Sequence, residues 1–375
     1  MKKKVLIITS SLRFSRGAPK VAAALTMSLS SKYNVSTLTF HHSDKLYPFK
    51  GTYFSINEKS HFSHLINRLI KLYYAIKFIS PDIIITFMSR TSFWIIPLKY
   101  IFNLNIPLII DVTTNPNLHY KKRIYGKCLV RYLFPLKKAN AIVPVSKELK
   151  EIFNKDYKIP NSKIIPIYNS IDVDKIQKKA QEKLDDFEEV YNDKNIMKFI
   201  TVGRLSGEKG HRYLIEAYSK VIKEIPNSRL FIIGEGPLKR QLEELITVKE
   251  LKKYVILLGS VKNPYNYISK ANVFVLPSLH EGLPYVLLEA LACKTPIIST
   301  DCKTGPKEIL GNGEYGLLVN TADSNDLANK MIQLAKDQTA REVFSKKSAQ
   351  QVKIFDNKNF TDNWVKLVEN HLINA

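Results

Sequence analysis

The sequence predicts an α/β protein of two domains, each a parallel sheet between helices, that face each other across a cleft. Short β-branched runs alternate with longer amphipathic segments, which is the pattern of repeated β-α units. The apolar runs are continuous instead of alternating, so helices are expected to cover both faces of each sheet. The chain has 375 residues, which is long for one domain and comfortable for two.

The first half of the chain supplies the elements of one domain. A loop with Gly17 follows the first strand, and Pro19 then favours a helix start because proline is tolerated in a first turn. Ser146 is a good N-cap residue after the last strand of this half. We expect strands at residues 5–9, 34–40, 82–87, 107–112 and 141–145, and helices at residues 19–30 and 60–79.

The second half repeats the same alternation of strand and helix. Continuous apolar runs are again separated by amphipathic stretches, which predicts a second parallel sheet. We expect strands at residues 197–202, 229–233, 254–258, 273–276 and 296–299, and helices at residues 210–225, at 238–249 and from Pro284 onward.

The joint between the domains is expected between Asn169 and Asn195. Residues 175–189 in this stretch are highly charged and helical in pattern. The last helix carries apolar residues at helical spacing, which is typical of a packing helix. We therefore place the domains at residues 1–170 and 171–358, with a C-terminal helix at residues 359–375 that packs back on the first domain.

The formal net charge is +23, and most of the excess lies in the first half. Residues 1–150 contain 24 lysines and arginines and only five acids. This asymmetry predicts an anionic partner, either nucleic acid or the inner leaflet of a membrane. Residues 60–79, which mix basic and aromatic side chains, and the basic cluster at 121–138 fit a membrane surface. For residues 60–79, an ordinary helix packed on its own sheet fits equally well.

Cysteine usage and hydropathy indicate the compartment. Cys128, Cys293 and Cys302 are widely spaced and odd in number, so they fit neither a disulfide framework nor a zinc site and favour a reducing environment. No apolar run is clean enough for a membrane span, and the start lacks the core of a signal peptide. We expect a cytoplasmic protein, peripherally associated with the inner face of the cell membrane.

One segment of the second half, residues 278–290, combines a strand end, a loop and a helix start. Glu281 and Gly282 lie in the loop, and Pro284 takes the first helical position, where its missing N–H costs nothing. The free N–H groups of the first turn favour an anion, and glycine allows close approach of the backbone. Glu289, further along the helix, can reach back toward the same loop, and its carboxylate suits the hydroxyls of a sugar or ribose. The alternative to ligand binding is structural: Glu281 would help cap the helix, and Glu289 would be a surface residue.

A second segment of this kind precedes it in the chain. Residues 199–210 place Gly203 at a strand end, followed by Arg204 and Lys209 in a short loop before a helix. Ligands of open α/β sheets bind outside the carboxyl ends of the strands. A guanidinium grips a diphosphate in two places, and an ammonium adds a point charge. Two anion-suited loops in one domain predict a phosphate-bearing ligand.

Together these segments resemble the retaining glycosyltransferases of family 4, which have the two-domain GT-B fold, and in particular the capsule and exopolysaccharide type. The family signatures are a G-R-x-x-x-x-K loop and an E-x₇-E motif. The resemblance spans nearly the whole chain. Its matches are Gly203-Arg204 with Lys209, Glu281 with Glu289, and the stretches at 143–146, 167–172, 233–237 and 305–309.

The resemblance implies roles for these residues. Arg204 and Lys209 would neutralise the donor diphosphate and support the leaving nucleotide. Glu281 would face the transferred sugar without being a covalent nucleophile, because retention in the family is explained by front-face attack assisted by the leaving phosphate. Glu289 would bind the ribose hydroxyls. The other implied donor contacts are Gly203, Gly282, Leu283, Pro284, Val261 in the base-binding loop, and Gly17 from across the cleft.

Two departures from the family concern the first half. Gly17 is a single glycine where many relatives have a pair, and Thr113 stands where many have a histidine. Asn115 and His119 are the nearby candidates for contact with the substrate. The D-x-D run at residues 172–174 resembles the metal motif of other glycosyltransferases but falls in the interdomain segment. We expect no catalytic metal and no cofactor beyond the UDP-sugar, which is itself the donor substrate.

The sequence thus predicts a hexosyl- or N-acetylhexosaminyltransferase. It would move a sugar from a UDP-sugar to a lipid-linked glycan at the cytoplasmic membrane face, in synthesis of a capsule, exopolysaccharide or wall glycan. A sugar-nucleotide epimerase of the same GT-B build is the enzymatic alternative, and it would need neither an acceptor nor a basic docking face. A nucleic-acid-binding protein would explain the charge but would leave both anion loops unexplained, and no recognised nucleic-acid module is present.

Overall fold

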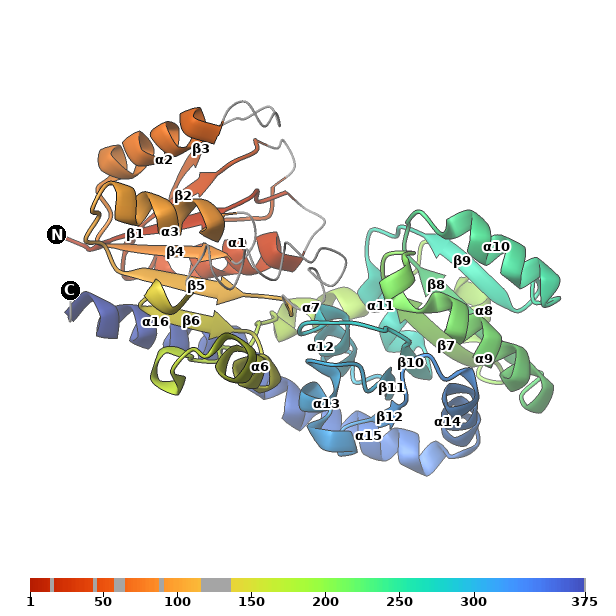
Figure 1. The fold of residues 1–375 in the computed structure, drawn as a ribbon. Helices are drawn as coiled ribbons and strands as arrows, with labels where there is room; N and C mark the ends of the chain where they lie inside the picture. Colours follow the sequence, from red (N-terminus) through yellow and green to blue (C-terminus); the bar gives the residue numbers. More distant parts are fainter. Residues whose placement is uncertain (14–16, 43–45, 57–64, 88–90, 116–135, 374–375) are drawn as a thin grey trace. The chain divides into compact units, whose positions relative to one another are not determined.

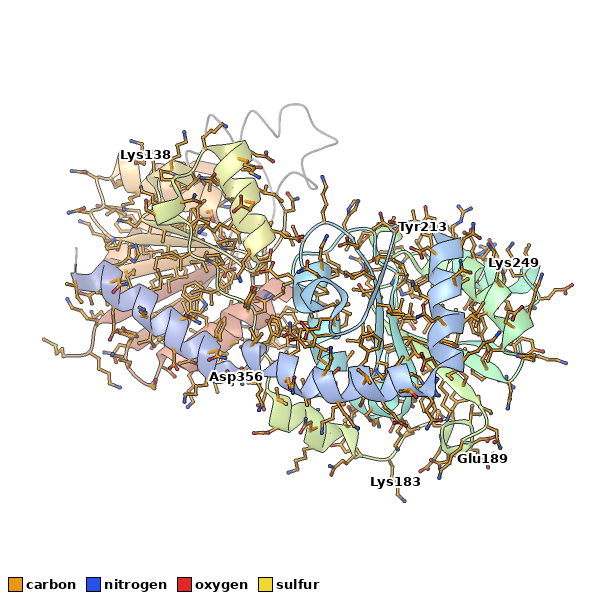
Figure 2. All side chains as sticks on the ribbon, turned by 90° about the horizontal axis from the view of Figure 1, so that it is seen from below. Lys138, Lys183, Glu189, Tyr213, Lys249 and Asp356 are labelled. Atoms are coloured by element: carbon orange, nitrogen blue, oxygen red, sulfur yellow. The ribbon has the colours of Figure 1, made fainter. Side chains whose placement is uncertain are left out.

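The computed structural model contains two compact units (Figure 1). The first unit comprises Met1–Ser170 and Asn357–Ala375, and the second comprises Ile171–Asp356. Asp356, labelled in Figure 2, is the last residue of the second unit before the chain returns to the first. The structure describes residues 1–13, 17–42, 46–56, 65–87, 91–115 and 136–373.

The first unit is built on a six-stranded sheet in which every neighbouring pair is parallel. Its inner strands are buried along nearly their whole length, as continuous β-branched runs predict. The order is β3 (Thr52–Ser55), β2 (Asn34–Thr39), β1 (Lys4–Thr9), β4 (Ile83–Phe87), β5 (Leu108–Val112) and β6 (Ala141–Pro144).

Helices cover both faces of this sheet. α2 (Leu65–Ile79), α3 (Ser92–Ile101) and α6 (Lys147–Tyr157) share one apolar core with the strands. α6 is capped by Ser146, whose side chain accepts a hydrogen bond from the backbone N–H of Leu149, as expected for an N-cap serine. α1 (Gly17–Leu29) packs against the C-terminal helix α16 (Asn357–Ile373).

α16 is held on the first unit by apolar and polar contacts. Its residues Phe360, Trp364, Leu367 and Val368 are all buried. The Thr361 hydroxyl donates to the Ser28 hydroxyl of α1 at 2.8 Å, and Glu369 pairs with Lys32 just beyond α1. The apolar spacing of this helix therefore marks a packing face, as the sequence predicts.

The second unit has the same construction. Its sheet is entirely parallel, and the order reverses between β7 and β10. One face packs against α9 (His211–Glu224), α10 (Lys239–Val248) and α14 (Ser324–Lys336). The strand order is β12 (Leu317–Val319), β11 (Ile297–Thr300), β10 (Val273–Leu276), β7 (Met197–Val202), β8 (Ser228–Ile233) and β9 (Val255–Gly259).

Shorter helices gather on the other side of the second unit. Tyr191 packs its ring on Phe231 of β8 and edge-on to Tyr267, which joins helices to the sheet through aromatic contacts. These helices are α7 (Val173–Ala180), α8 (Glu188–Asn192), α11 (Pro264–Lys270), α12 (Tyr285–Ala292) and α13 (Pro306–Ile309), and α15 (Gln338–Gln351) packs on α12.

The prediction of one helical stretch over residues 175–189 is wrong. α7 ends at Ala180, and α8 begins only at Glu188. The amide of Asn263 donates to the Lys179 carbonyl and that of Asn266 to the Lys183 carbonyl. Side chains of α11 and its cap therefore satisfy backbone groups that a continuous helix would have satisfied itself.

The sequence prediction has no counterpart for two short edge strands, β3 and β12, or for the helices α3, α11, α13, α14 and α15. β3 and β12 contain four and three residues and are only partly buried, so they lack the long apolar run that reveals the inner strands. α3 contains Pro97, which argues against a helix when only the sequence is known. Among the described residues, no helix is both long and apolar enough to cross a membrane.

Candidate functional site

The two predicted anion loops lie side by side at the carboxyl edge of the second sheet. From β7 the chain proceeds outward through β8 and β9 and then returns to β10, the other neighbour of β7. Such a reversal is the topological switch point at which open α/β sheets bind ligands. The segment with Gly203, Arg204 and Lys209 follows β7, and the segment with Glu281 follows β10. Both motifs therefore flank the switch point.

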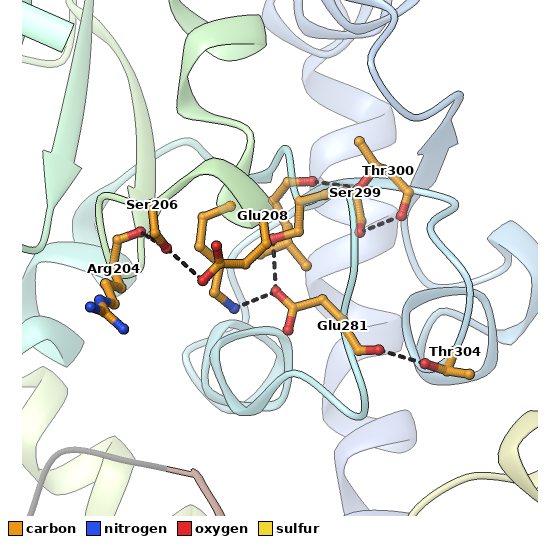
Figure 3. A network of polar contacts seen from close by, with 10 residues as sticks. Arg204, Ser206, Glu208, Glu281, Ser299, Thr300 and Thr304 are labelled. Carbon is orange, nitrogen blue, oxygen red and sulfur yellow. Dashed lines mark hydrogen bonds and ion pairs between the residues drawn. The ribbon is translucent and has the colours of Figure 1, made fainter. Parts of the chain in front are cut away.

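An ion pair joins the two loops. The Lys209 Nζ lies 2.7 Å from Oε1 of Glu281, and the Ser278 hydroxyl donates to the same carboxylate oxygen at 2.7 Å (Figure 3). The Glu281 side chain is 8% exposed and that of Lys209 is 26% exposed. Because the pair is largely withdrawn from water, it is less screened than a surface salt bridge.

A second link runs through Glu208. The backbone N–H of Leu279 donates to the Glu208 carbonyl at 2.8 Å, which fixes one loop against the other. The Ser206 hydroxyl donates to the Glu208 carboxylate at 2.6 Å. Arg204 is exposed, and its guanidinium extends away from these contacts in Figure 3. The structure thus brings Lys209 and Glu281 together and does not bring Arg204 to them.

The close packing of the loops depends on two glycines with positive φ. Gly210 has φ +66°, and a Cβ there would lie 2.0 Å from the Pro277 carbonyl oxygen. Gly305 has φ +95°, and a Cβ there would lie 2.3 Å from the Gly282 carbonyl oxygen. No other residue type fits either position without moving the backbone of the site.

Pro284 does not occupy the first helical position predicted for it. It is the N-cap residue, with φ −68° and ψ 113°, and α12 begins at Tyr285. The extended ψ lets the chain turn from the loop into the helix while Gly282 stays against Gly305. Leu283 is buried beside it. The predicted strand–loop–helix context is otherwise present.

Glu289 lies in α12 and is 7% exposed, so it is not a surface residue. The Tyr265 hydroxyl donates to its Oε1 at 3.4 Å. Val261 is half-buried in the loop between β9 and α11, beyond Gly259. Both residues therefore belong to the same unit as the Lys209–Glu281 pair.

The remaining predicted site residues belong to the first unit. Gly17 is the first residue of α1 and is exposed. Asn115 is buried in the loop after β5. Because strand β5 ends at Val112, Asn115 lies beyond the carboxyl end of its strand, as ligand-binding loops of this architecture do. His119 and the basic cluster at 121–131 lie outside the described residues.

Thr304 supports the site, although the sequence prediction missed it. Its hydroxyl donates to the backbone carbonyl of Glu281 at 2.5 Å, and its side chain is 1% exposed. Its φ is +71°, which is unfavourable for a β-branched residue and indicates a backbone held in place by its surroundings. The stretch at residues 305–309 matches the family, but no feature of the sequence indicates that Thr304, directly before it, has a strained backbone.

His211 is a second residue that the prediction missed. It is the first residue of α9, directly after Gly210, and is 3% exposed. Burial lowers its pKa to about 4, and the charge of Lys209 adds to that effect, so the imidazole is neutral at pH 7. Its Nδ1 has no hydrogen-bond partner within the described part of the chain. Because His211 is neutral, it adds no second positive charge beside Lys209.

The D-x-D run has a structural role. Asp172 is the N-cap of α7, and its carboxylate accepts a hydrogen bond from the backbone N–H of Lys175 at 3.0 Å. Within the described ranges, no cluster of three or more histidine, cysteine or acidic side chains could hold a metal ion. The observed polar groups instead suit a ligand with anionic phosphates and sugar hydroxyls.

Two family models match the chain. Residues 15–175 match Glycosyltransferase Family 4, and residues 181–351 match Glycosyl transferases group 1. With relatives more than 30% identical over most of its length, the chain belongs to the family 4 glycosyltransferases. Its two parallel-sheet units form the GT-B fold.

Three similar proteins illustrate the relationship. The N-acetylgalactosamine-N,N'-diacetylbacillosaminyl-diphospho-undecaprenol 4-alpha-N-acetylgalactosaminyltransferase of Campylobacter jejuni is 31% identical over 355 residues, covering 91% of this chain and 93% of the relative. The UDP-Gal:alpha-D-GlcNAc-diphosphoundecaprenol alpha-1,3-galactosyltransferase of Escherichia coli is 30% identical over 275 residues, covering 72% and 70%. The structure of Anabaena HepE with UDP and glucose superimposes with a TM-score of 0.80 at 17% identity, covering 98% of this chain and 100% of that one.

Proposed function

We propose that this glycosyltransferase moves a hexose or N-acetylhexosamine from a UDP-sugar to a lipid-linked glycan, with retention of the anomeric configuration. The Lys209–Glu281 pair at the switch point of the second sheet is the observation that carries the proposal. The Campylobacter and Escherichia relatives act on glycans attached to diphospho-undecaprenol. Both form α linkages, and the second uses UDP-galactose as its donor.

In the proposed reaction the bond between the anomeric carbon and the diphosphate oxygen breaks. A hydroxyl oxygen of the acceptor forms the new bond on the same face, and its proton passes to the leaving phosphate. Lys209 and Arg204 stabilise the negative charge that grows on the diphosphate. Glu281 holds Lys209 in place and accepts hydrogen bonds from sugar hydroxyls. No covalent glycosyl intermediate on Glu281 is required, in contrast to a retaining glycosidase.

The other predicted residues would position the two substrates. We assign Glu289 to the ribose hydroxyls, because the family resemblance implies that role and its buried carboxylate lies in the same unit as the Lys209–Glu281 pair. Val261 would contact the base, while Gly203, Gly282, Leu283 and Pro284 would line the donor. Gly17, Asn115 and His119 would serve the donor diphosphate and the acceptor from the first unit. The proposed reaction uses no metal and no further cofactor.

We place the reaction at the cytoplasmic face of the cell membrane, where a lipid-linked acceptor is accessible. The first unit, with its excess of basic residues, would bind the anionic surface. The product would be a precursor of a capsule, an exopolysaccharide or a wall glycan. The relatives' acceptors support this assignment, because undecaprenol is an apolar chain.

The proposal is tested by nucleotide release from a panel of UDP- and GDP-sugars, with and without a membrane lipid extract. We expect release from one UDP-sugar that increases with lipid and is lost in Glu281→Ala. Conversion of one donor into its epimer, without transfer, would instead identify the epimerase. Salt-sensitive nucleic-acid binding that is unaffected by loss of Lys209, with no affinity for UDP, would identify the nucleic-acid alternative.

A further inference from the structure

The outer face of α2 is apolar although it faces solvent. Leu72, Ile76 and Ile79 are buried in the core of the first unit. On the opposite side, Ile70, Tyr74 and Phe78 are 42%, 66% and 79% exposed. Because these three residues are spaced by four, they form one stripe along the helix. The helix therefore has two apolar faces, one packed on the sheet and one exposed.

Basic side chains accompany the stripe. Lys71 and Lys77 are exposed on α2, and the Lys77 ammonium lies 5.4 Å from the ring centroid of Tyr73. The helix contains no acidic residue. A packed surface helix normally exposes charges of both signs, whereas a helix that lies on an anionic bilayer exposes aromatic and apolar side chains between lysines.

The apolar surface continues onto the neighbouring helix. Phe102, at the end of α3, stacks on Tyr73 of α2 with ring centroids 4.1 Å apart. Tyr100 and Ile101 beside it are 53% and 64% exposed. The Lys138 ammonium lies 5.3 Å from the Tyr100 ring centroid, so this part of the surface also combines an aromatic ring with a cation. In Figure 1, α2 and α3 run next to each other on one side of the sheet.

A hollow of about 690 Å³ opens where this surface reaches the amino-terminal edge of the sheet. Phe78 lines it from the end of α2, and Phe54 of β3 meets Phe78 edge to face, with ring centroids 6.2 Å apart. Lys4 and Lys50 supply two ammonium groups, and none of the described residues that line the hollow is acidic. Its walls therefore offer cations for a phosphate and aromatic rings for apolar carbon.

We propose that the α2 stripe, with the end of α3, docks on an anionic phospholipid bilayer, and that the Lys4–Lys50 hollow receives the phosphate headgroup of one lipid. Phe78 belongs to both features, so the buried rings and the bound phosphate would lie at one interface. The hollow is at the edge of the sheet opposite to the strand ends that precede Gly17 and Asn115. It is thus a site separate from those residues. The choice of a membrane as partner rests on the proposed function.

The test is flotation of the purified full chain with vesicles of phosphatidylcholine alone or mixed with phosphatidylglycerol, in the absence of any sugar donor. We expect binding to the anionic vesicles only. Tyr74→Ser with Phe78→Ser should lower that binding by more than about tenfold, because two exposed rings no longer enter the interface. Lys4→Gln with Lys50→Gln should lower vesicle binding at least about tenfold, since each lysine near the membrane adds to the attraction to its anionic surface.

Matched control variants come from the second unit. Val248→Ser with Val343→Ser removes two exposed apolar side chains and no charge, and Lys252→Gln with Lys253→Gln removes the same charge as the Lys4 and Lys50 variant, so both should bind like the wild type. Equal binding by all variants, or no vesicle binding by the wild type, would overturn the proposal. So would tighter binding to RNA than to anionic vesicles. Circular dichroism confirms that each variant is folded. Vesicle binding needs no catalysis, so its failure is distinct from failure of glycosyl transfer.

Discussion

The ammonium of Lys209 lies 2.7 Å from a carboxylate oxygen of Glu281, and this contact ties the loop after β7 to the loop after β10. Each of the two signature motifs contributes one partner. The pair therefore makes the position of Lys209, the cation proposed to bind the diphosphate, depend on the residue that would face the sugar. This relationship is the basis of the predictions for the donor site.

Glu281→Ala should lower kcat by about a hundredfold or more, a size typical for loss of a preorganised polar group. It removes the partner that orients Lys209, whereas Glu281→Gln keeps a hydrogen-bond acceptor and should lose less. Steady-state kinetics with the preferred UDP-sugar give the comparison. Glu314→Ala is the control, because that carboxylate forms only an exposed pair with Lys347, with 3.8 Å between Nζ and Oε1. Equal activity of Glu281→Ala and Glu314→Ala would contradict the assignment.

Lys209→Met should weaken UDP binding by about tenfold to a hundredfold, since a hydrogen bond to a charged group contributes about 1.5–3 kcal/mol. Arg204→Met should have a similar effect if the exposed guanidinium turns to the diphosphate. Isothermal titration calorimetry with UDP measures both. Lys239→Met, which removes an exposed lysine paired with Glu235, should bind UDP as the wild type does. Unchanged affinity in Lys209→Met would remove the cation from the donor site.

Thr304→Val should lower kcat by about tenfold, because the Glu281 carbonyl loses its hydrogen-bond donor while the shape of the side chain is kept. Thr304→Ser retains the hydroxyl and should restore most of the rate. Since the hydroxyl acts through the loop, the substrate dependence should show a change mainly in kcat. A Thr304→Val enzyme as active as Thr304→Ser would show that the contact is dispensable.

The pH dependence of stability should reveal His211. Its pKa is lowered from 6.5 to about 4 by burial, so below pH 6.5 the unfolded chain binds a proton that the folded chain does not. The contribution is fully present above pH 6.5 and is lost as the pH falls toward 4, with a total of about 3 kcal/mol. Urea unfolding of wild type and His211→Gln measures it. His41→Gln, at an exposed histidine, should follow the wild type, and a parallel pH profile for His211→Gln would contradict this account.

Transfer should proceed unchanged in the presence of EDTA. The D-x-D run caps α7 through Asp172, so Asp172→Ser should retain activity because serine is also a good cap residue. Rates before and after chelation, and after addition of Mg²⁺ or Mn²⁺, test this prediction. If EDTA abolished the rate and one of these metals restored it, a metal would take part in transfer.

The sequence was sufficient for the fold class because its strands are buried on both faces. Residues 5–8 of β1 are all apolar, so continuous hydrophobicity identifies this strand. β3 and β12 were not predicted because these two edge strands are short and partly exposed. The break between α7 and α8 was also hidden, since it depends on Asn263 and Asn266, far away in the sequence.

The position of the two loops after β7 and β10 could likewise be predicted, because glycine, cation and acid follow the strand ends in the sequence. Thr304 could not, since its importance lies in a positive φ and in a hydrogen bond to a residue 23 positions away. His211 could not either, because its lowered pKa results from burial that its neighbours in sequence do not reveal. Pro284 was misplaced by one position, as the extended ψ at the cap is a property of the folded loop.

We propose that the second unit's site transfers a sugar to a lipid-linked glycan. The most direct measurement is mass spectrometry of a diphospho-undecaprenol-linked glycan after incubation with the donor that the release assay selects, followed by NMR of the new linkage. We expect an acceptor heavier by one hexose or N-acetylhexosamine residue in α linkage, and no such product from Glu281→Ala. An unmodified acceptor beside an epimerised donor, or a product with a β linkage, would contradict it.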